Sequence, residues 1–438
     1  MTAGMSQARK RGTPFVLRRG LLRALAVVGA CTLGIASMAP AAVAADGVQS
    51  KQWYLDAMNA EDIWKSATGK GIKVAVIDTG VNPSTPSLTG QVLKGFDATG
   101  TAGEATDDYS GHGTTMAELI AGTGKSGGIR GLAPDAKIIP MRITDTEMQN
   151  NQSVNAFDAE DAIRAAADSD AQIISMSFSS DFSAPKEREA VKYAESKGKL
   201  FFAGVGNNAQ KGNKKQYPAS YPQVVGVAAS GPDGRVADYS QHGDSVDIAA
   251  PGNDIPRWCD ESFTKYCDGD GGTSAATAIA SASAALIWSA NPDWTANQVL
   301  RVMFESAGRG EDWKPGTVSN YAGHGVVRPG AHINRGVGKP GDPNLSPLTN
   351  ERTPGSPGAP GSSESSASSE PSGSASAPAS GASNAPGDGD GDGGKAVAAG
   401  AGKSTEDDSQ LGLILGGAAV VVVLAGGAFF VLRKRRAA

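Results

Sequence analysis

Between Trp53 and about Gly338 the chain alternates short apolar runs with longer stretches in which apolar residues recur at helical spacing. The short runs are rich in β-branched residues and apolar throughout, which is typical of strands buried on both faces of a sheet. They lie at Ile72–Ile77, Lys137–Ile143, Ala171–Phe178, Leu200–Val205 and Val224–Ala229. The helical patterns lie around Ala117 and at Ala156–Ala167, Lys186–Lys197, Ser274–Ser289 and Thr295–Ala307. This alternation predicts an α/β fold with helices on both faces of a mostly parallel sheet.

The pattern at the N-terminus is that of a secretory signal peptide. Residues 1–45 contain six basic residues and no acid, and an apolar run at Leu21–Ile35 is followed by small residues. We therefore expect cleavage after Ala45. Two alternatives remain open: Arg18-Arg19 as part of a twin-arginine signal, and Val28-Gly29-Ala30-Cys31 as a lipidation site.

A second apolar segment, residues 411–432, carries no charge and is long enough to span a bilayer core of about 30 Å. Four basic residues follow it directly, at 433–436. Positive charge is retained on the cytoplasmic side, so we expect a cytoplasmic tail at 433–438 and an extracellular location for everything before the helix. The sequence thus predicts a single-pass protein of a bacterial cell membrane.

The segment before this helix, residues 340–410, is dominated by Pro, Gly, Ser and Ala. It cannot bury enough apolar surface to offset the entropy of ordering, so we expect a disordered linker between a folded domain at 46–339 and the membrane. Asp388, Asp390 and Asp392 faintly resemble a calcium loop, but the closing Glu of an EF-hand is missing. We expect no metal there.

Net charge bears on the possible partners, and the cysteines bear on disulfide formation. The formal net charge is −5, and without the ten basic residues in 1–45 and 433–438 the exported part carries about −15 by residue counting. An acidic exterior argues against nucleic acid as a partner. Of three cysteines, Cys31 leaves with the signal. Cys259 and Cys267 remain in an oxidising compartment, so we expect a disulfide between them, with two unpaired thiols as the alternative.

Three segments at the expected carboxyl ends of strands carry candidate chemistry. They read VAVIDTG at 74–80, SGHGT at 110–114 and GTSAA at 272–276. Singly, an Asp at a strand end or a Ser at a helix start is commonly a cap, and an isolated His is commonly structural. Together, Asp78, His112 and Ser274 supply a carboxylate, a base and a nucleophile in the chain order of one known protease class.

These motifs are similar to the three signatures of the subtilisin-like serine proteases, or subtilases, and the resemblance extends from about Trp53 to Gly338. It implies a three-layer subtilisin-like fold and a serine endopeptidase that works through an acyl-enzyme, without cofactor. Ser274 is then the nucleophile, His112 the general base and acid, and Asp78 the residue that orients the imidazole.

The resemblance also implies an oxyanion site and a substrate-binding strand. Asn207, directly after Gly206, resembles the family's oxyanion Asn, with Asn208 as the alternative, and the backbone N–H of Ser274 is a second donor. Ser177 and Phe178 resemble part of the family's strand that pairs with substrate. Gly206 is also expected to contact substrate. Ser179 stands where the family usually has glycine, so subsite preference is open.

Some departures from the family pattern bear on metals and packing. The loop at 122–128 lacks the Asn-rich calcium site of secreted subtilisins, so we expect no required metal. His242, His324 and His332 have no Cys or acid at ligand spacing and are expected to be structural. Ala278 and Ile279 replace the usual Pro and His after the nucleophile, which predicts altered packing with the chemistry retained.

The order of segments resembles the mycosins, membrane-anchored subtilases associated with type VII secretion. Few residues separate Ala45 from Gln52, where the mature domain is expected to start, so no folded prodomain is expected. Protein or peptide substrates are the expected partners, and the resemblance adds secretion-system proteins. It also suggests an alternative, a catalytically silent scaffold within a secretion complex. The triad and Asn207 favour the enzyme.

Overall fold

The computed structural model describes residues 47–143, 159–269, 271–310, 313–314 and 316–354. The predicted signal peptide, the part of the predicted linker at 355–410, the predicted membrane helix at 411–432 and the basic tail lie outside these residues. The folded region therefore carries the site predicted from the three motifs.

The central sheet has seven strands in the order β2-β3-β1-β4-β5-β6-β7, and every pairing in it is parallel. The strands are β1 (Lys73–Asp78), β2 (Phe96–Asp97), β3 (Lys137–Arg142), β4 (Ile173–Met176), β5 (Leu200–Gly204), β6 (Val225–Ser230) and β7 (Ile248–Pro251). All five apolar runs form strands, which confirms the predicted parallel sheet. The short β2 and the strand β7 extend it at its two edges.

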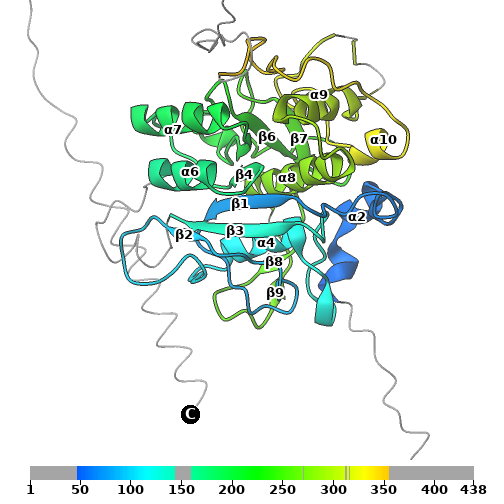
Figure 1. The fold of residues 1–438 in the computed structure, drawn as a ribbon. Helices are drawn as coiled ribbons and strands as arrows, with labels where there is room; N and C mark the ends of the chain where they lie inside the picture. The colour runs from blue at the N-terminus through cyan, green and yellow to red at the C-terminus, as the bar shows by residue number, and fades with distance from the viewer. Residues whose placement is uncertain (1–46, 144–158, 270, 311–312, 315, 355–438) are drawn as a thin grey trace, which may run out of the picture. The chain divides into compact units, whose positions relative to one another are not determined.

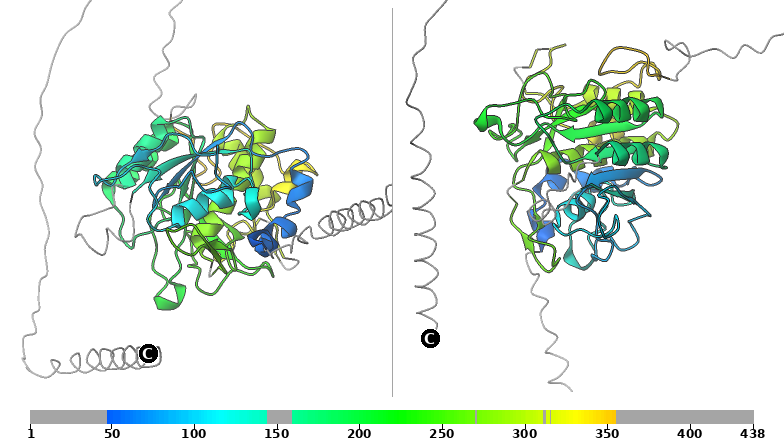
Figure 2. Two further views of the ribbon diagram at one scale, coloured as in Figure 1. Left: turned by 90° about the horizontal axis from the view of Figure 1, so that it is seen from below. Right: turned by 90° about the vertical axis from the view of Figure 1, so that its left-hand side faces the viewer.

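Helices cover both faces of the sheet (Figures 1 and 2). Side chains alternate along β1, so that Val74 and Val76 join one core cluster and Ala75 and Ile77 the other. The first cluster includes α4 (His112–Ala121), α8 (Thr273–Ala290) and α9 (Ala296–Ser306). The second includes α6 (Ala159–Asp168) and α7 (Pro185–Ser196). Because both faces are buried, the strands are apolar throughout.

Helix α8 runs through the centre of the first helix layer and contacts β4, β5, β6 and β7. Within the described residues it is the one helix long and apolar enough to cross a membrane, but 83% of its most apolar stretch is buried inside the domain. Small side chains, including Ala276, Ala280 and Ala284, let it approach the sheet closely. It is a core helix that carries Ser274 in its first turn.

The remaining elements are short. They are η1 (Val48–Lys51), α2 (Trp53–Ala57), α3 (Ala60–Ile63), η2 (Lys125–Gly127), η3 (Ala209–Lys211), α10 (Pro329–Ile333) and an antiparallel pair, β8 (Arg257–Trp258) and β9 (Tyr266–Cys267).

Residues 340–354, the first part of the predicted linker, lie against α9. Asn297 Nδ2 donates to Pro343 O at 3.0 Å, and Arg301 Nη2 donates to Leu345 O at 2.9 Å.

Candidate active site

The sequence-predicted site residues meet at the carboxyl edge of the sheet, where parallel α/β proteins place their sites. Asp78 is the last residue of β1, and Ser177 directly follows β4. Asn207 follows β5, while His112 and Ser274 lie in the first turns of α4 and α8. Because β1, β4 and β5 are neighbours in the sheet, five segments far apart in sequence converge on one region.

Asp78 and His112 form a hydrogen-bonded pair, with Asp78 Oδ1 and His112 Nδ1 2.7 Å apart. The Asp78 side chain is 2% exposed and the His112 side chain 38% exposed. The backbone N–H of Thr79 donates to the same carboxylate oxygen at 2.8 Å. An ionised carboxylate only accepts hydrogen bonds, so in the neutral ring the Nδ1 atom carries the proton and Nε2 keeps its lone pair.

The glycines around His112 permit this close approach of α4 to β1. Gly111 has φ +79°, a left-handed backbone conformation that side chains disfavour. A Cβ on Gly113 would lie 2.2 Å from Gly80 O and 3.0 Å from Asp78 Cβ. The motif therefore contains glycine on both sides of His112 for two separate reasons, a turn and a steric contact.

The electrostatic surroundings of His112 shift its pKa upwards. Burial lowers the pKa of the imidazole, but the charge and hydrogen bond of Asp78, with a smaller effect from Asp108, outweigh it. Arg257 acts in the opposite direction. The net pKa of His112 lies above its ordinary value of 6.5. The site thus stabilises the imidazolium that forms when His112 accepts a proton.

Ser274 is linked to the segment after β4 by two hydrogen bonds. Its Oγ donates to Ser177 O at 3.3 Å, and Ser177 Oγ donates to Ser274 O at 3.3 Å. The pair fixes the start of α8 relative to β4. The Ser274 backbone N–H lies in the first turn of α8, where N–H groups have no acceptor within the helix.

Asn207 lies against the segment that precedes Ser274. Its Oδ1 accepts a hydrogen bond of 2.9 Å from Thr273 N, and its Nδ2 is 3.3 Å from where a Cβ on Gly272 would lie. Gly206 has φ +105°, and a Cβ there would come within 1.8 Å of Gln241 Oε1. The alternative residue, Asn208, stands at the N-cap of η3 instead.

Residues 177–179 lie between the end of β4 and an antiparallel bridge from Ser180 to Tyr217. The bridge has two hydrogen bonds of 2.9 Å, between each backbone N–H and the other residue's carbonyl. Phe178 packs against the core cluster of α6 and α7, whereas Ser179 is exposed. Residues 177–179 thus have an anchored end and an exposed side chain, and Ser177 is hydrogen-bonded to Ser274.

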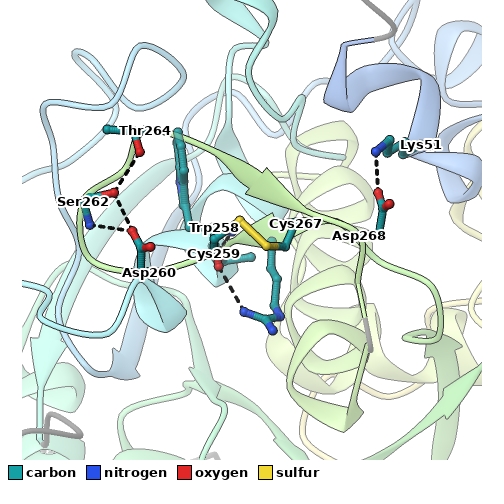
Figure 3. Close-up of a disulfide and its surroundings, with 10 residues drawn as sticks. Lys51, Trp258, Cys259, Asp260, Ser262, Thr264, Cys267 and Asp268 are labelled. Carbon is teal, nitrogen blue, oxygen red and sulfur yellow. Dashed lines mark hydrogen bonds and ion pairs between the residues drawn. A yellow bond between two sulfur atoms is a disulfide. The ribbon is translucent and has the colours of Figure 1, made fainter. Parts of the chain in front are cut away.

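The predicted disulfide is confirmed, with the Cα atoms of Cys259 and Cys267 5.0 Å apart. Figure 3 shows it between the two strands of the hairpin β8–β9, beside Trp258. Trp258 N donates to Thr115 Oγ1 at 3.1 Å, and Tyr266 Oη donates to Glu118 Oε2 at 2.8 Å. The hairpin therefore packs on α4, the helix that begins at His112. Lys51 and Asp268 form an ion pair at its end.

One residue beside the Asp–His pair, Asp108, is not marked by any of the three motifs. It is 6% exposed and accepts hydrogen bonds from Thr79, Ser110, Gly111 and Thr114. Asp108 lies three residues before Gly111, the N-cap of α4, so it does not stand at the cap position that a sequence pattern would mark. Among the residues that the structure describes, no group of three or more His, Cys, Asp or Glu side chains could hold a metal ion.

A parallel α/β sheet that has, at the carboxyl ends of its strands, a hydrogen-bonded Asp–His pair and a serine in the first turn of a helix defines a subtilisin-like protein. The sequence matches the Subtilase family, Peptidase S8, over residues 69–325. The chain belongs to this family.

Two relatives extend the comparison. The chain is 34% identical over 268 residues to "Thermophilic serine proteinase" of Bacillus sp. (strain AK1), a match that covers 60% of this chain and 63% of that protein. It is 32% identical over 278 residues to "Thermitase" of Thermoactinomyces vulgaris, which covers 62% of this chain and 95% of that protein. The chain thus spans less than two thirds of the first relative and nearly all of the second.

Among solved structures, MycP1 from the ESX-1 type VII secretion system is similar over 68% of this chain and 88% of its own length. The TM-score is 0.57 and the sequence identity 26%. The likeness to this mycosin agrees with the resemblance found in the order of segments.

Proposed function

We propose that this protein is a serine endopeptidase that hydrolyses peptide bonds in proteins through an acyl-enzyme intermediate. The observation that carries the proposal is the 2.7 Å contact between Asp78 Oδ1 and His112 Nδ1, at the carboxyl ends of the strands, where Ser274 lies in the first turn of α8. Family membership and a relative named as a serine proteinase support the same activity.

In the acylation step, His112 Nε2 takes the proton of Ser274 Oγ as that oxygen attacks the substrate carbonyl carbon. The C–N bond then breaks, and the proton passes from His112 to the leaving amine. In deacylation the same nitrogen takes a proton from water, whose oxygen attacks the ester. The acid product leaves, and the proton returns to Ser274 Oγ.

Asp78 and Asn207 act on the charges that develop in these steps. The buried carboxylate of Asp78 fixes the tautomer of His112 and stabilises the imidazolium. We assign the oxyanion donors to Asn207 Nδ2 and the backbone N–H of Ser274, which also lies at the positive end of the α8 dipole. The Thr273 N–H bonded to Asn207 Oδ1 orients the amide so that Nδ2 is available.

The substrate binds, in this proposal, as an extended strand beside Ser177, Phe178 and Ser179. Addition of a peptide strand to exposed backbone is a recurring mode of recognition and requires no particular side chain. The bridge from Ser180 to Tyr217 anchors the end of this segment. Gly206 forms part of the opposite wall, where a side chain is sterically excluded.

We further propose that the catalytic domain lies outside the cell, on a linker attached to a membrane helix at residues 411–432. The signal-peptide pattern, the apolar run and the basic residues after it support this topology. The likeness to MycP1 supports a setting near a secretion complex. Secretion-system proteins are accordingly the proposed partners besides substrates.

A fluorophosphonate probe tests the activity directly. It reacts with an activated serine, so we expect labelling of the wild type and none of Ser274→Ala. The matched control is Ser196→Ala, which removes an exposed hydroxyl at the end of α7 and should remain labelled. If the wild type is folded, as judged by circular dichroism, and stays unlabelled, the result would favour the silent scaffold instead.

Protease accessibility in right-side-out spheroplasts tests the topology. Added protease should cut between residues 355 and 410 and release a fragment that the probe still labels. Deletion of residues 411–438 should release soluble, labelled protein. Protection of 355–410 from added protease in intact spheroplasts, with cleavage only after lysis, contradicts the extracellular location.

A further inference from the structure

The carboxylate of Asp108 is buried in the loop before α4 and bonds to two different segments of the site. Its Oδ1 accepts from Thr79 Oγ1 at 2.8 Å, from Ser110 N at 3.0 Å and from Gly111 N at 2.9 Å. Thr79 directly follows Asp78, and Gly111 directly precedes His112. One oxygen atom therefore joins the turn after Asp78 to the start of the His112 helix.

The second oxygen of Asp108 extends the connection into α4. Oδ2 accepts from Thr114 N at 2.9 Å and from Thr114 Oγ1 at 2.6 Å. Thr79 Oγ1 in turn accepts from Gly113 N at 2.9 Å. The turn after Asp78 and the first turn of α4 are thus connected both through Asp108 and directly.

The hydrogen bonds around Asp108 compensate for the burial of its carboxylate. A buried carboxylate is costly unless hydrogen bonds compensate it, and bonds to an ionised acceptor are about twice as strong as neutral ones. Five donors converge on Asp108, and they come from both segments that hold the Asp–His pair. Burial raises the pKa of Asp108, and the bonds from Thr114, Ser110 and Thr79 oppose that rise.

We propose that Asp108 is a positioning residue for the reaction, which holds His112 against Asp78 by joining Thr79 to the first turn of α4. The inference rests on the proposed peptidase activity. It assigns Asp108 no contact with substrate: its oxygens are occupied by the protein's own donors. Its loss should therefore reduce kcat and leave KM nearly unchanged.

A charge effect accompanies the geometric one. The charged groups that face His112 are Asp78 at the end of β1, Asp108 in the loop before α4 and Arg257 in β8. Asp78 and Asp108 raise the pKa of His112, and Arg257 lowers it. Removing the charge of Asp108 should move the acidic limb of the pH–rate profile to lower pH.

The test is Asp108→Asn in the full chain, with Asp170→Asn as a matched control. Asp170 is an exposed acid, with 81% of its side chain accessible, at the amino ends of the strands, opposite the site. The Asn side chain keeps one acceptor but turns an N–H₂ group towards existing donors. We expect kcat to fall by roughly tenfold to a hundredfold, as for a slightly misplaced catalytic group. We also expect the acidic limb to move down, and the control to match the wild type in both.

Thr79 provides a second route if Asp108→Asn fails to fold. Thr79→Val keeps the shape but removes the hydroxyl bonded to Asp108 and Gly113, whereas Thr79→Ser retains it. We expect the Val variant to lose kcat and the Ser variant to stay within about twofold of wild type.

The outcomes distinguish a failure of the proposed peptidase activity from a failure of the positioning role of Asp108. An unlabelled, inactive wild type refutes the proposed function itself. An active wild type with a folded Asp108→Asn variant of unchanged kcat and pH profile overturns the positioning role. A lower melting temperature with unchanged kinetics would reduce Asp108 to a stability residue and overturns the proposal equally.

Discussion

The Oδ1 atom of Asn207 accepts a hydrogen bond of 2.9 Å from the backbone N–H of Thr273, the residue immediately before Ser274. This contact joins the loop after β5 to the start of α8. It also determines which end of the amide faces outward, because an oxygen engaged by an N–H leaves the N–H₂ group as the free donor. The start of α8 thus orients the side chain that we propose as an oxyanion donor.

Replacement of Asn207 by Ala should therefore lower kcat by about 10²–10³ with little change in KM, since the lost donor acts on the developing oxyanion. Asn208→Ala is the matched control, because Asn208 is the neighbouring amide at the N-cap of η3. Steady-state kinetics on a peptide substrate checks both. A large loss with Asn208→Ala and none with Asn207→Ala would reverse the assignment of the donor.

The pH dependence of kcat/KM should have an acidic limb whose midpoint lies above 6.5, because His112 has a raised pKa and must be neutral to act as base. The rate is retained above that pKa and lost as the pH falls through it. Arg257→Gln should move the midpoint further up, since the removed charge disfavours the imidazolium. This displacement is opposite to that expected for Asp108→Asn. A midpoint below 6.5 contradicts the electrostatic argument.

Glu118 offers a prediction on stability, since it is fully buried on α4 and burial raises its pKa to about 7. The folded state binds its proton more tightly than the unfolded state does, where the pKa is near 4.5. The stabilisation is present below about pH 4.5 and is lost as the pH rises through 7. Glu118→Gln should thus gain up to about 3 kcal/mol over the wild type between acidic and alkaline pH.

Denaturant unfolding at several pH values measures this difference. Glu187→Gln is a useful comparison, because that acid also has a pKa raised by burial but lies on α7, in the opposite helix layer. A constant difference between Glu118→Gln and the wild type from acidic to alkaline pH would show that Glu118 keeps its charge on folding.

The disulfide should stabilise the hairpin and, through it, α4. Cys259 and Cys267 are eight positions apart, and closing so short a loop contributes roughly 2–3 kcal/mol in the chain-entropy account. The double variant Cys259→Ser/Cys267→Ser should lower the free energy of unfolding by about that amount. Thermal unfolding with and without a reductant provides the measurement. A reductant should affect the wild type and leave the double variant unchanged.

The sequence predicts the central strands well because each is an uninterrupted apolar run. The run Leu200–Val205 corresponds to β5 at Leu200–Gly204, and the run Lys137–Ile143 to β3 at Lys137–Arg142. The two-residue strand β2 has no such pattern, since Phe96 is partly exposed and pairs with β3 at a sheet edge. Its pairing depends on tertiary contacts that local sequence does not encode.

The candidate site shows the same division. Asp78, His112 and Ser274 stand in motifs whose glycines are required by close backbone contacts, so the local sequence indicates them. Asp108 has no such signature: its role depends on Thr79 and Thr114 reaching it from separate elements. The pairing of Asn207 with Thr273, across 66 residues, is likewise a property of the folded chain.

The attachment of residues 340–354 to α9 has a mechanical consequence. Pro343 and Leu345 are hydrogen-bonded to α9, and residues 343–354 share a cavity of about 350 Å³ with Leu200, the first residue of β5. A pulling force applied beyond Pro354 would act on the domain near the amino ends of the strands. The bond between Asp78 and His112 and the bond between Asn207 and Thr273 lie at the carboxyl ends of the strands, away from the segment that would be pulled. In the proposed topology, a force on the linker would therefore act at the end of the domain opposite the Asp78–His112 pair.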